Sequence, residues 1–288
     1  MVIRINPSRM PLWRSPTGMQ FGSGPNALRI ENVSRAQERL IHLLLRGMPN
    51  GLVREMADTL GVQEHETLIS ALEPALMDYR FAHVDADFVA KQFAEICRVQ
   101  STHNFNGEAV IAGRKLRRVF VSEPHDLLQN ALSNSGVGEV RSDNFLQFDF
   151  AILIAHHAVS PQSYSPWLSA AVPHVAIIYN ADGVVVTPVI ERGKTPCLNC
   201  FHQEQSKLDS AWPELASQML FSKQRFDDST SQLFGSAIAC QRALETLDAL
   251  SDFEVRDRNR MGYRLSFSSG TVSEFAWGYA SDCLCQQG

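Results

Sequence analysis

The chain has 288 residues, of which 44% are hydrophobic and 20% are charged, and its formal net charge is −5. This is the composition of an ordinary globular protein with one large domain or two modest ones. The negative charge argues against nucleic acid as the main partner, and no apolar run reaches the length of a membrane span. Because the N-terminal residues also lack the apolar core of a signal peptide, we expect a cytoplasmic protein.

The first 80 residues predict a small sheet followed by helices. Residues 11–21 form a bent strand or hairpin in this prediction, and residues 27–33 form a second strand. Three amphipathic helices are expected over residues 35–46, 52–60 and 64–77. A small sheet, a helix, a short helix, a glycine turn and a third helix are typical of a winged-helix domain, which we expect over residues 1–80.

The third helix bears on what this domain binds. A DNA-recognition helix is rich in Arg and Lys, whereas this one carries Glu64, Glu66 and Glu73. A peptide-binding or purely structural role is therefore favoured over transcription regulation. An extended peptide can add to a sheet edge and place side chains against a neighbouring helix. The candidate residues for peptide binding are Leu68, Leu72, Glu73 and Leu76. For the three leucines, a place in the hydrophobic core is the alternative.

The remainder of the chain predicts a connecting region over residues 81–108 and an α/β domain over residues 109–288. In the connecting region we expect a helix over residues 85–99 and a polar linker over residues 100–107. The expected strands of the α/β domain span residues 110–112, 118–121, 150–155, 175–179 and 184–190, with a hairpin over 263–267 and 272–277. Its expected helices span residues 124–133, 165–171, 204–224 and 230–250. Alternating strands and helices indicate an α/β layer fold.

Two close cysteine pairs stand far apart in the sequence. Cys197 and Cys200 have a two-residue spacer, and Cys283 and Cys285 have a one-residue spacer near the end of the chain. Four thiolates in two pairs are what a closed tetrahedral zinc site needs. Free thiols or two disulfides are the alternatives, but nothing in the sequence points to an oxidising compartment. The other cysteines, interpreted as small buried hydrophobic residues, are Cys97 and Cys240.

Several segments carry a resemblance to a known family. Residues 172–178, 182–190 and 192–201 resemble the ThiF/MoeB superfamily of ubiquitin-activating-enzyme-like adenylyltransferases. This resemblance implies a Rossmann-type sheet and a structural zinc site completed by a second cysteine pair near the end. Residues 209–219 and 11–22 resemble a bacterial branch of cyclodehydratase-type, leader-peptide-binding proteins. The resemblance to this branch implies a peptide-recognition winged helix, a precursor leader peptide and a YcaO-type cyclodehydratase as partners, and it leaves a homodimer open.

The departures from the family pattern concern nucleotide binding. A glycine-rich turn lets backbone amides approach the phosphates of ATP, but the matching segment over residues 118–128 has no glycine and carries Glu123. Where the family has a magnesium-binding Asp, this chain has His156 and His157, which suit a surface or pocket wall better than a second metal site. No residue is assigned a catalytic role, and no ATP is expected.

These observations favour a non-catalytic, zinc-binding scaffold that binds a leader peptide and presents it to a cyclodehydratase. The first alternative is an ATP-dependent adenylyltransferase acting on a carboxylate, which the glycine-free turn disfavours. The second alternative is a winged-helix transcription regulator, which the acidic third helix disfavours.

Overall fold

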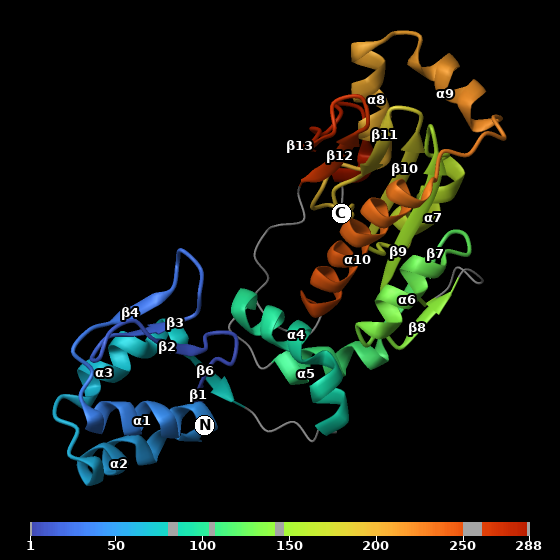
Figure 1. Cartoon of the computed structure of the whole chain (residues 1–288). Helices are drawn as coiled ribbons and strands as arrows, with labels where there is room; N and C mark the ends of the chain where they lie inside the picture. Colours follow the sequence, from blue (N-terminus) through green and yellow to red (C-terminus); the bar gives the residue numbers. More distant parts are fainter. Residues whose placement is uncertain (1, 80–85, 104–106, 142–146, 250–260, 287–288) are drawn as a thin grey trace. The chain divides into compact units, whose positions relative to one another are not determined.

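The computed structural model describes residues 2–79, 86–103, 107–141, 147–249 and 261–286. The chain divides into two compact units, one running to Ala112 and the other beginning at Gly113 (Figure 1). Each unit has a hydrophobic core of its own. None of the described helices combines the length and the apolar character that crossing a membrane requires.

The first unit combines two small antiparallel sheets with helices. Its strands are β1 (Val2–Ile5), β2 (Pro11–Trp13), β3 (Met19–Phe21), β4 (Leu28–Ile30), β5 (Met48–Pro49) and β6 (Leu76–Tyr79). The strand orders are β5-β1-β6 and β2-β3-β4. Its helical segments are α1 (Arg35–Arg46), η1 (Asn50–Leu52), α2 (Val53–Leu60), α3 (His65–Leu72), η2 (Glu73–Ala75), α4 (Ala86–His103) and α5 (Gly107–Gly113), the last of which crosses the boundary between the units.

Helix α1 shows why the sequence folds as it does in this unit. Ser34 caps its N-terminus, because the Ser34 hydroxyl accepts from the backbone of Gln37 while the Gln37 side chain accepts from the backbone of Ser34. Leu40 and Leu44 are fully buried on its inner face. Gly47 ends the helix at a φ of +87°, where a β-carbon would be strained.

Three predictions for this region were wrong. The third helix was expected to reach residue 77, but α3 ends at Leu72, and Leu76 pairs with Ile5 as part of β6. Pro74 cannot supply an internal helical hydrogen bond, so the helix turns into η2 and then a strand. Residues 110–112 were expected to form a strand but lie in α5. The expected linker over residues 100–107 is helical to His103, and residues 104–106 lie outside the described part.

The second unit is built on one mixed sheet of seven strands in the order β13-β12-β11-β10-β9-β7-β8. Its strands are β7 (Arg118–Val121), β8 (Glu139–Arg141), β9 (Phe150–His156), β10 (His174–Asn180), β11 (Gly183–Val186), β12 (Gly262–Ser266) and β13 (Thr271–Phe275). Strands β8, β7, β9 and β10 pair in parallel, whereas β11, β12 and β13 add antiparallel neighbours. Its helical segments are η3 (Arg114–Leu116), α6 (Asp126–Asn134), α7 (Pro161–Ser169), α8 (Leu198–Leu208), α9 (Trp212–Leu220), α10 (Ser229–Ala249) and η4 (Leu284–Gln286).

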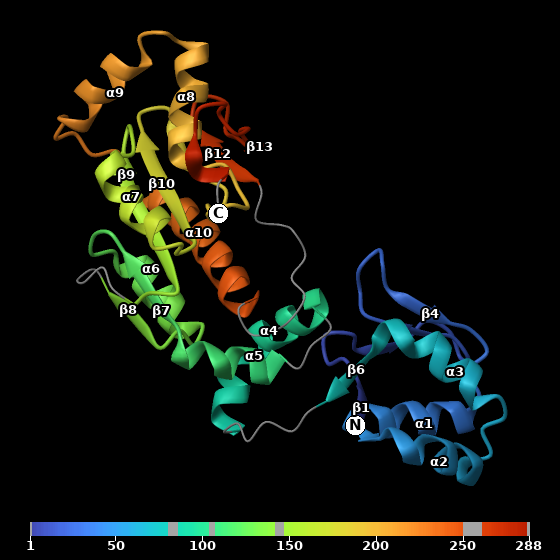
Figure 2. The ribbon, with the colours of Figure 1, turned by 180° about the vertical axis from the view of Figure 1, so that it is seen from behind.

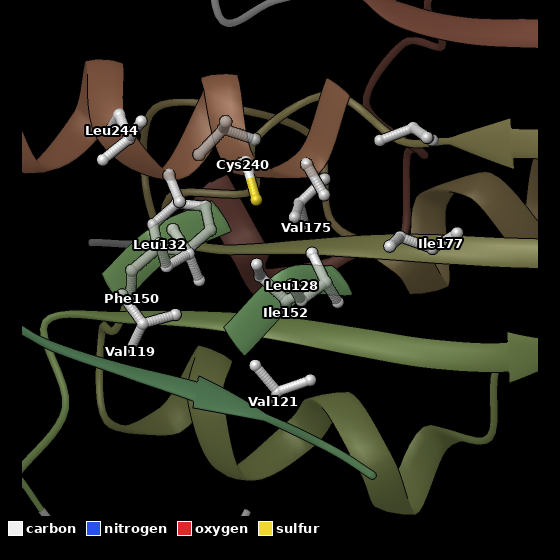
Figure 3. Packing of buried hydrophobic residues seen from close by; sticks show 14 of the residues in the cluster. Val119, Val121, Leu128, Leu132, Phe150, Ile152, Val175, Ile177, Cys240 and Leu244 are labelled. Atoms are coloured by element: carbon white, nitrogen blue, oxygen red, sulfur yellow. The ribbon is translucent and has the colours of Figure 1, made fainter. Parts of the chain in front are cut away.

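Both faces of the sheet are covered at its central strands β7, β9, β10 and β11. On one face, α6 and α10 pack on the alternate residues of the parallel strands, as the close view of Leu128, Val175, Ile177 and Leu244 shows (Figure 3). The other face is covered by α7 and α8, with Trp167 fully buried at its centre. Because both faces are buried, β9 and β10 are continuous apolar runs and not alternating ones.

Other boundaries in this unit differ from the sequence prediction. The polar stretch over residues 204–224 was expected to be one helix, but it is the end of α8 and the separate helix α9 (Figure 2). The break falls where the Asp209 side chain accepts from the backbone of Ala211 and Pro213 opens the next helix. Strand β8 of this unit was not predicted, and neither were strands β1 and β5 of the first unit.

Candidate metal centre, strand-end network and peptide groove

The structure brings the four paired cysteines together. The Sγ atoms of Cys197, Cys200, Cys283 and Cys285 all lie within 4.8 Å of one another. Neighbouring sulfurs are 3.5 Å apart between Cys197 and Cys283, 3.5 Å between Cys200 and Cys285, and 3.9 Å between Cys197 and Cys200. Zinc–sulfur bonds of about 2.3 Å in a tetrahedron separate sulfurs by about 3.8 Å, so this cluster has the dimensions of a zinc site.

Local structure explains how two distant segments meet. Cys197 is the N-cap of α8 and Cys200 lies in its first turn, so their sulfurs share one side of the helix start. The hairpin of β12 and β13 leads the chain back to Cys283. Two hydrogen bonds fix the junction: the backbone of Gly193 donates to the Cys285 carbonyl at 3.0 Å, and Trp277 Nε1 donates to the Cys197 carbonyl at 3.1 Å.

Burial opposes ionisation of the cysteine sulfurs when no cation is bound. Burial raises the pKa of the Cys197 thiol, and burial likewise raises the pKa of Cys285 to about 11. At Cys283 burial also opposes ionisation, but a hydrogen bond from Asn199 Nδ2 and bonds with the neighbouring cysteines outweigh it and lower the pKa to about 7. A metal ion would keep all four sulfurs deprotonated, because thiolates are its ligands.

The other two cysteines are not part of this cluster. Cys240 is buried on α10 among the side chains that cover the sheet, and Cys97 is half-buried on α4 in the first unit. Within the described part of the chain, the four paired cysteines are the one group of three or more His, Cys, Asp or Glu residues with metal-binding spacing. His156 and His157 belong to no such group in the described residues.

A polar network occupies the carboxyl ends of the parallel strands. After β7, Ser122 accepts a hydrogen bond from the backbone of Ile154 at 2.7 Å, which ties this turn to β9. The next residue, Glu123, is held by both terminal nitrogens of Arg225 at 3.1 and 3.0 Å. Arg225 also donates to both carboxylate oxygens of Asp227, at 3.2 and 2.8 Å. The turn after β7 is thus spanned by an ion-pair network of side chains.

The two adjacent histidines face different surroundings. His156 Nε2 lies 3.8 Å from Glu123, and its pKa is lowered chiefly by burial and then by the nearby Arg225 charge. His157 has a φ of +66° and packs its ring edge-on against Phe226, with 4.9 Å between centroids. It also lines a cavity of about 480 Å³ with Trp212 and Arg264. The interpretation as a pocket-lining residue agrees with the placement of His157, whereas His156 is not among the residues that line this cavity.

In the first unit, a groove of about 480 Å³ runs along one flank of α3. Of the four residues proposed for peptide binding, Glu73 and Leu76 line the groove, whereas Leu68 and Leu72 are buried in the core of the unit. The other groove-lining residues are Asn50, Val53, Arg54, His65, Glu66, Ile69 and Ser70.

Sequence reasoning missed the partners that complete these sites. Arg225 lies 102 positions from Glu123, and no spacing rule joins them. A detectable signal was the charged run that begins with Arg225 and continues to Asp227 and Asp228 in an otherwise polar connection. Val53 and Ile69 of the groove looked like ordinary apolar positions of amphipathic helices.

Several solved α/β proteins are similar to this chain in fold. Escherichia coli MccB matches with a TM-score of 0.68 and 12% identity over 99% of this chain and 97% of MccB. MccB solved with AMPCPP and selenomethionine MccA gives a TM-score of 0.70 over the whole of both chains. The heterocyclase TruD also gives 0.70, with 12% identity over 98% of this chain and 42% of TruD. The expected resemblance is confirmed as a likeness of fold, whereas no protein-family model and no curated protein sequence matches the chain.

Proposed function

We propose that this protein is a non-catalytic, zinc-stabilised scaffold that binds a ribosomal precursor peptide by its leader and presents it to a YcaO-type cyclodehydratase in the cytoplasm. The observation that carries the non-catalytic part is the clasp of Glu123 by Arg225 at the glycine-free turn after β7. In this proposal residues 1–80 are a winged-helix domain, residues 81–108 connect, and residues 109–288 form a Rossmann-type, ThiF-like domain.

The clasp disfavours nucleotide binding for two reasons. A triphosphate needs backbone amides or cations that are unoccupied, whereas both terminal nitrogens of Arg225 already bond to Glu123. The Glu123 and Asp227 carboxylates would also repel phosphate oxygens. Hydrogen bonding to Arg225 lowers the pKa of Asp227, so this carboxylate is ionised at neutral pH.

The structural role of zinc is supported by the position of the cysteines. Cys197 and Cys200 lie at the start of α8, which covers one face of the sheet. Cys283 and Cys285 follow the antiparallel hairpin of β12 and β13, which forms one edge of the same sheet. A bound zinc would hold these segments together and close a loop of more than eighty residues, since Cys200 Sγ lies 3.5 Å from Cys285 Sγ across |i−j| = 85. Its chemistry here is that of a closed site with four protein ligands and no open position for substrate.

Peptide binding is supported by an open sheet edge and a groove in the first unit. β4 is a terminal strand of its sheet and pairs with β3, so among the described strands its outer edge has no partner. Such an edge can accept an extended peptide through backbone hydrogen bonds. The groove along α3 offers apolar contact at Ile69 and Leu76 and a carboxylate at Glu73, which suits a peptide with an apolar and a basic residue.

The solved structures of similar fold agree with a peptide partner. MccB has been solved with MccA, and a heterocyclase of similar fold, matching at a TM-score of 0.65, has been solved with substrate and cofactor. MccB has also been solved with ATP, which favours an adenylyltransferase as the second candidate. ATP–pyrophosphate exchange separates the two candidates.

The proposal is tested by calorimetry of the full chain with precursor peptides encoded beside its gene. We expect micromolar binding that weakens when Glu73→Lys reverses the groove charge. The matched control is Glu55→Lys, which changes another exposed carboxylate, on α2 and outside the groove. Binding that both variants lose equally, or no binding to any neighbouring peptide, contradicts the proposal.

A further inference from the structure

A second surface, in the other unit, lies on the turn before β7 and on the edge strand β8. It borders a hollow of about 400 Å³ lined by Lys115, Leu116, Arg117, Arg118, Gly138, Glu139 and Arg141. Four of these residues are cationic and one is a carboxylate, on a chain whose net charge is −5. We call this the basic hollow. Its charge is opposite to that of the chain as a whole.

Two exposed cations of the hollow share one carboxylate. Glu139 is shared by two cations: it lies 3.5 Å from Arg118 Nε and also pairs with Arg141. Asp149 lies 3.5 Å from Arg117. The side chains of Arg118 and Arg141 remain 45% and 60% exposed. Arg118 and Arg141 therefore outnumber the described carboxylate that they share, and both remain accessible to a partner.

An apolar side chain lies in the same hollow. Leu116 is 84% exposed, as is Phe221, and these are the largest exposed fractions of the large hydrophobic residues in the described part of the chain. Isolated exposed leucines are common, but this one is flanked in sequence by Lys115 and Arg117. An apolar residue ringed by cations is the arrangement of an interface anchor with a charged rim.

The turn that displays Leu116 is rigidly held. Arg114 is buried and donates to both carboxylate oxygens of Asp248 at 2.7 Å, and to the Ser135 carbonyl at 2.9 Å. The backbone of Gly138 donates to the Arg114 carbonyl at 3.0 Å, and a β-carbon at Gly138 would lie 1.9 Å from the Lys115 carbonyl oxygen. The exposure of Leu116 is thus fixed by the fold and does not come from a loose loop.

The hollow also borders an open sheet edge. β8 is the last strand in the sheet order and pairs with β7, so its outer edge has no partner among the described strands (Figure 1). Unpaired backbone groups on an edge strand can pair with an extended segment of another chain. Charged side chains on an edge also serve to prevent such pairing, and the experiment below distinguishes the two roles.

We propose that the basic hollow is a docking surface for an acidic, extended segment of a partner polypeptide that carries an apolar residue. The acidic side chains would face Arg118 and Arg141, the apolar side chain would contact Leu116, and the backbone would pair with β8. A polypeptide fits better than a nucleic acid, because the cations cover one short edge and the rest of the chain is net negative. This site is independent of the peptide groove along α3.

The first test measures binding of a fluorescein-labelled peptide of alternating Glu and Leu to the full chain by fluorescence anisotropy. Arg118→Glu with Arg141→Glu should abolish binding, whereas the same charge change at Lys207 and Lys223, exposed on the same unit, should leave it intact. Binding should weaken as salt rises. Absence of binding by the wild-type chain at low salt overturns the proposal, as does equal loss in the two double variants.

The second test asks whether Leu116 contributes apart from charge. Leu116→Ser should weaken peptide binding at least about fivefold without lowering the melting temperature, because the side chain is exposed. Leu208→Ser, which removes a leucine that is 76% exposed elsewhere on the unit, should change neither. The assignment is refuted if Leu116→Ser leaves the affinity for the peptide unchanged. It is also refuted if a single-stranded oligonucleotide of equal charge binds more tightly than the peptide. Either result indicates a general polyanion-binding surface.

Discussion

Replacing Cys200 by serine should lower the stability of the protein far more than replacing Cys97, which is not in the cluster. A zinc ion bound by both pairs links Cys200 to Cys285, which are separated by |i−j| = 85, and so closes a loop of more than eighty residues. A cross-link over such a loop stabilises the folded state by about 4–5 kcal/mol through the entropy of the unfolded chain. That is a large fraction of the stability of a typical domain.

The corresponding fall in melting temperature is roughly 10–15 °C for a unit of this size, because about 1 kcal/mol shifts the midpoint by about 2–4 °C. Differential scanning calorimetry of Cys200→Ser measures this shift, and elemental analysis of the same samples measures zinc. The control is Cys97→Ser, which changes a half-buried cysteine outside the cluster and should cost less than about 1 kcal/mol. Equal melting temperatures for the two variants, or purified wild-type protein without zinc, would refute the reasoning.

Two further predictions concern the strand-end network and a buried histidine. The full chain should show no ATP–pyrophosphate exchange with or without a precursor peptide, because Arg225 closes the turn at Glu123; peptide-stimulated exchange would move the protein to the enzyme class. Burial lowers the pKa of His174 to about 4, against about 6.5 in an unfolded chain, so its contribution to stability is complete above pH 6.5 and is lost as pH falls toward 4. Unfolding free energies at pH 8 and pH 5 should therefore differ by about 2 kcal/mol more in the wild type than in His174→Gln, and identical pH dependence in both would contradict this account.

The sequence by itself determined the elements whose signals are local. The apolar runs over residues 150–155 and 175–179 predict buried strands, because each residue of a strand covered on both faces must be apolar. Ser34 and Gly47 mark the ends of α1 through capping groups within the same few residues. The cysteine spacing also identified the four sulfurs that the fold brings together.

Tertiary structure decided what depends on partners distant in the sequence. Leu76 continues a helical pattern, yet it forms β6 because Pro74 ends the helix and β1 offers a strand to pair with. Residues 110–112 are apolar and suit a strand or a buried helix equally, and packing against α4 selects the helix, since Gly107 closely approaches the backbone of Ile96.

The chemistry of the sites divides in the same way. The absence of glycine after β7 was visible in the sequence, but the closure of that turn required Arg225, which the fold brings back from 102 positions away. The side chain of Leu116 belongs to an apolar type that is usually buried, yet it is exposed in a turn that the Arg114–Asp248 pair holds. Residue types and spacings set which chemistry is available, whereas only long-range packing sets which groups are exposed, paired or buried.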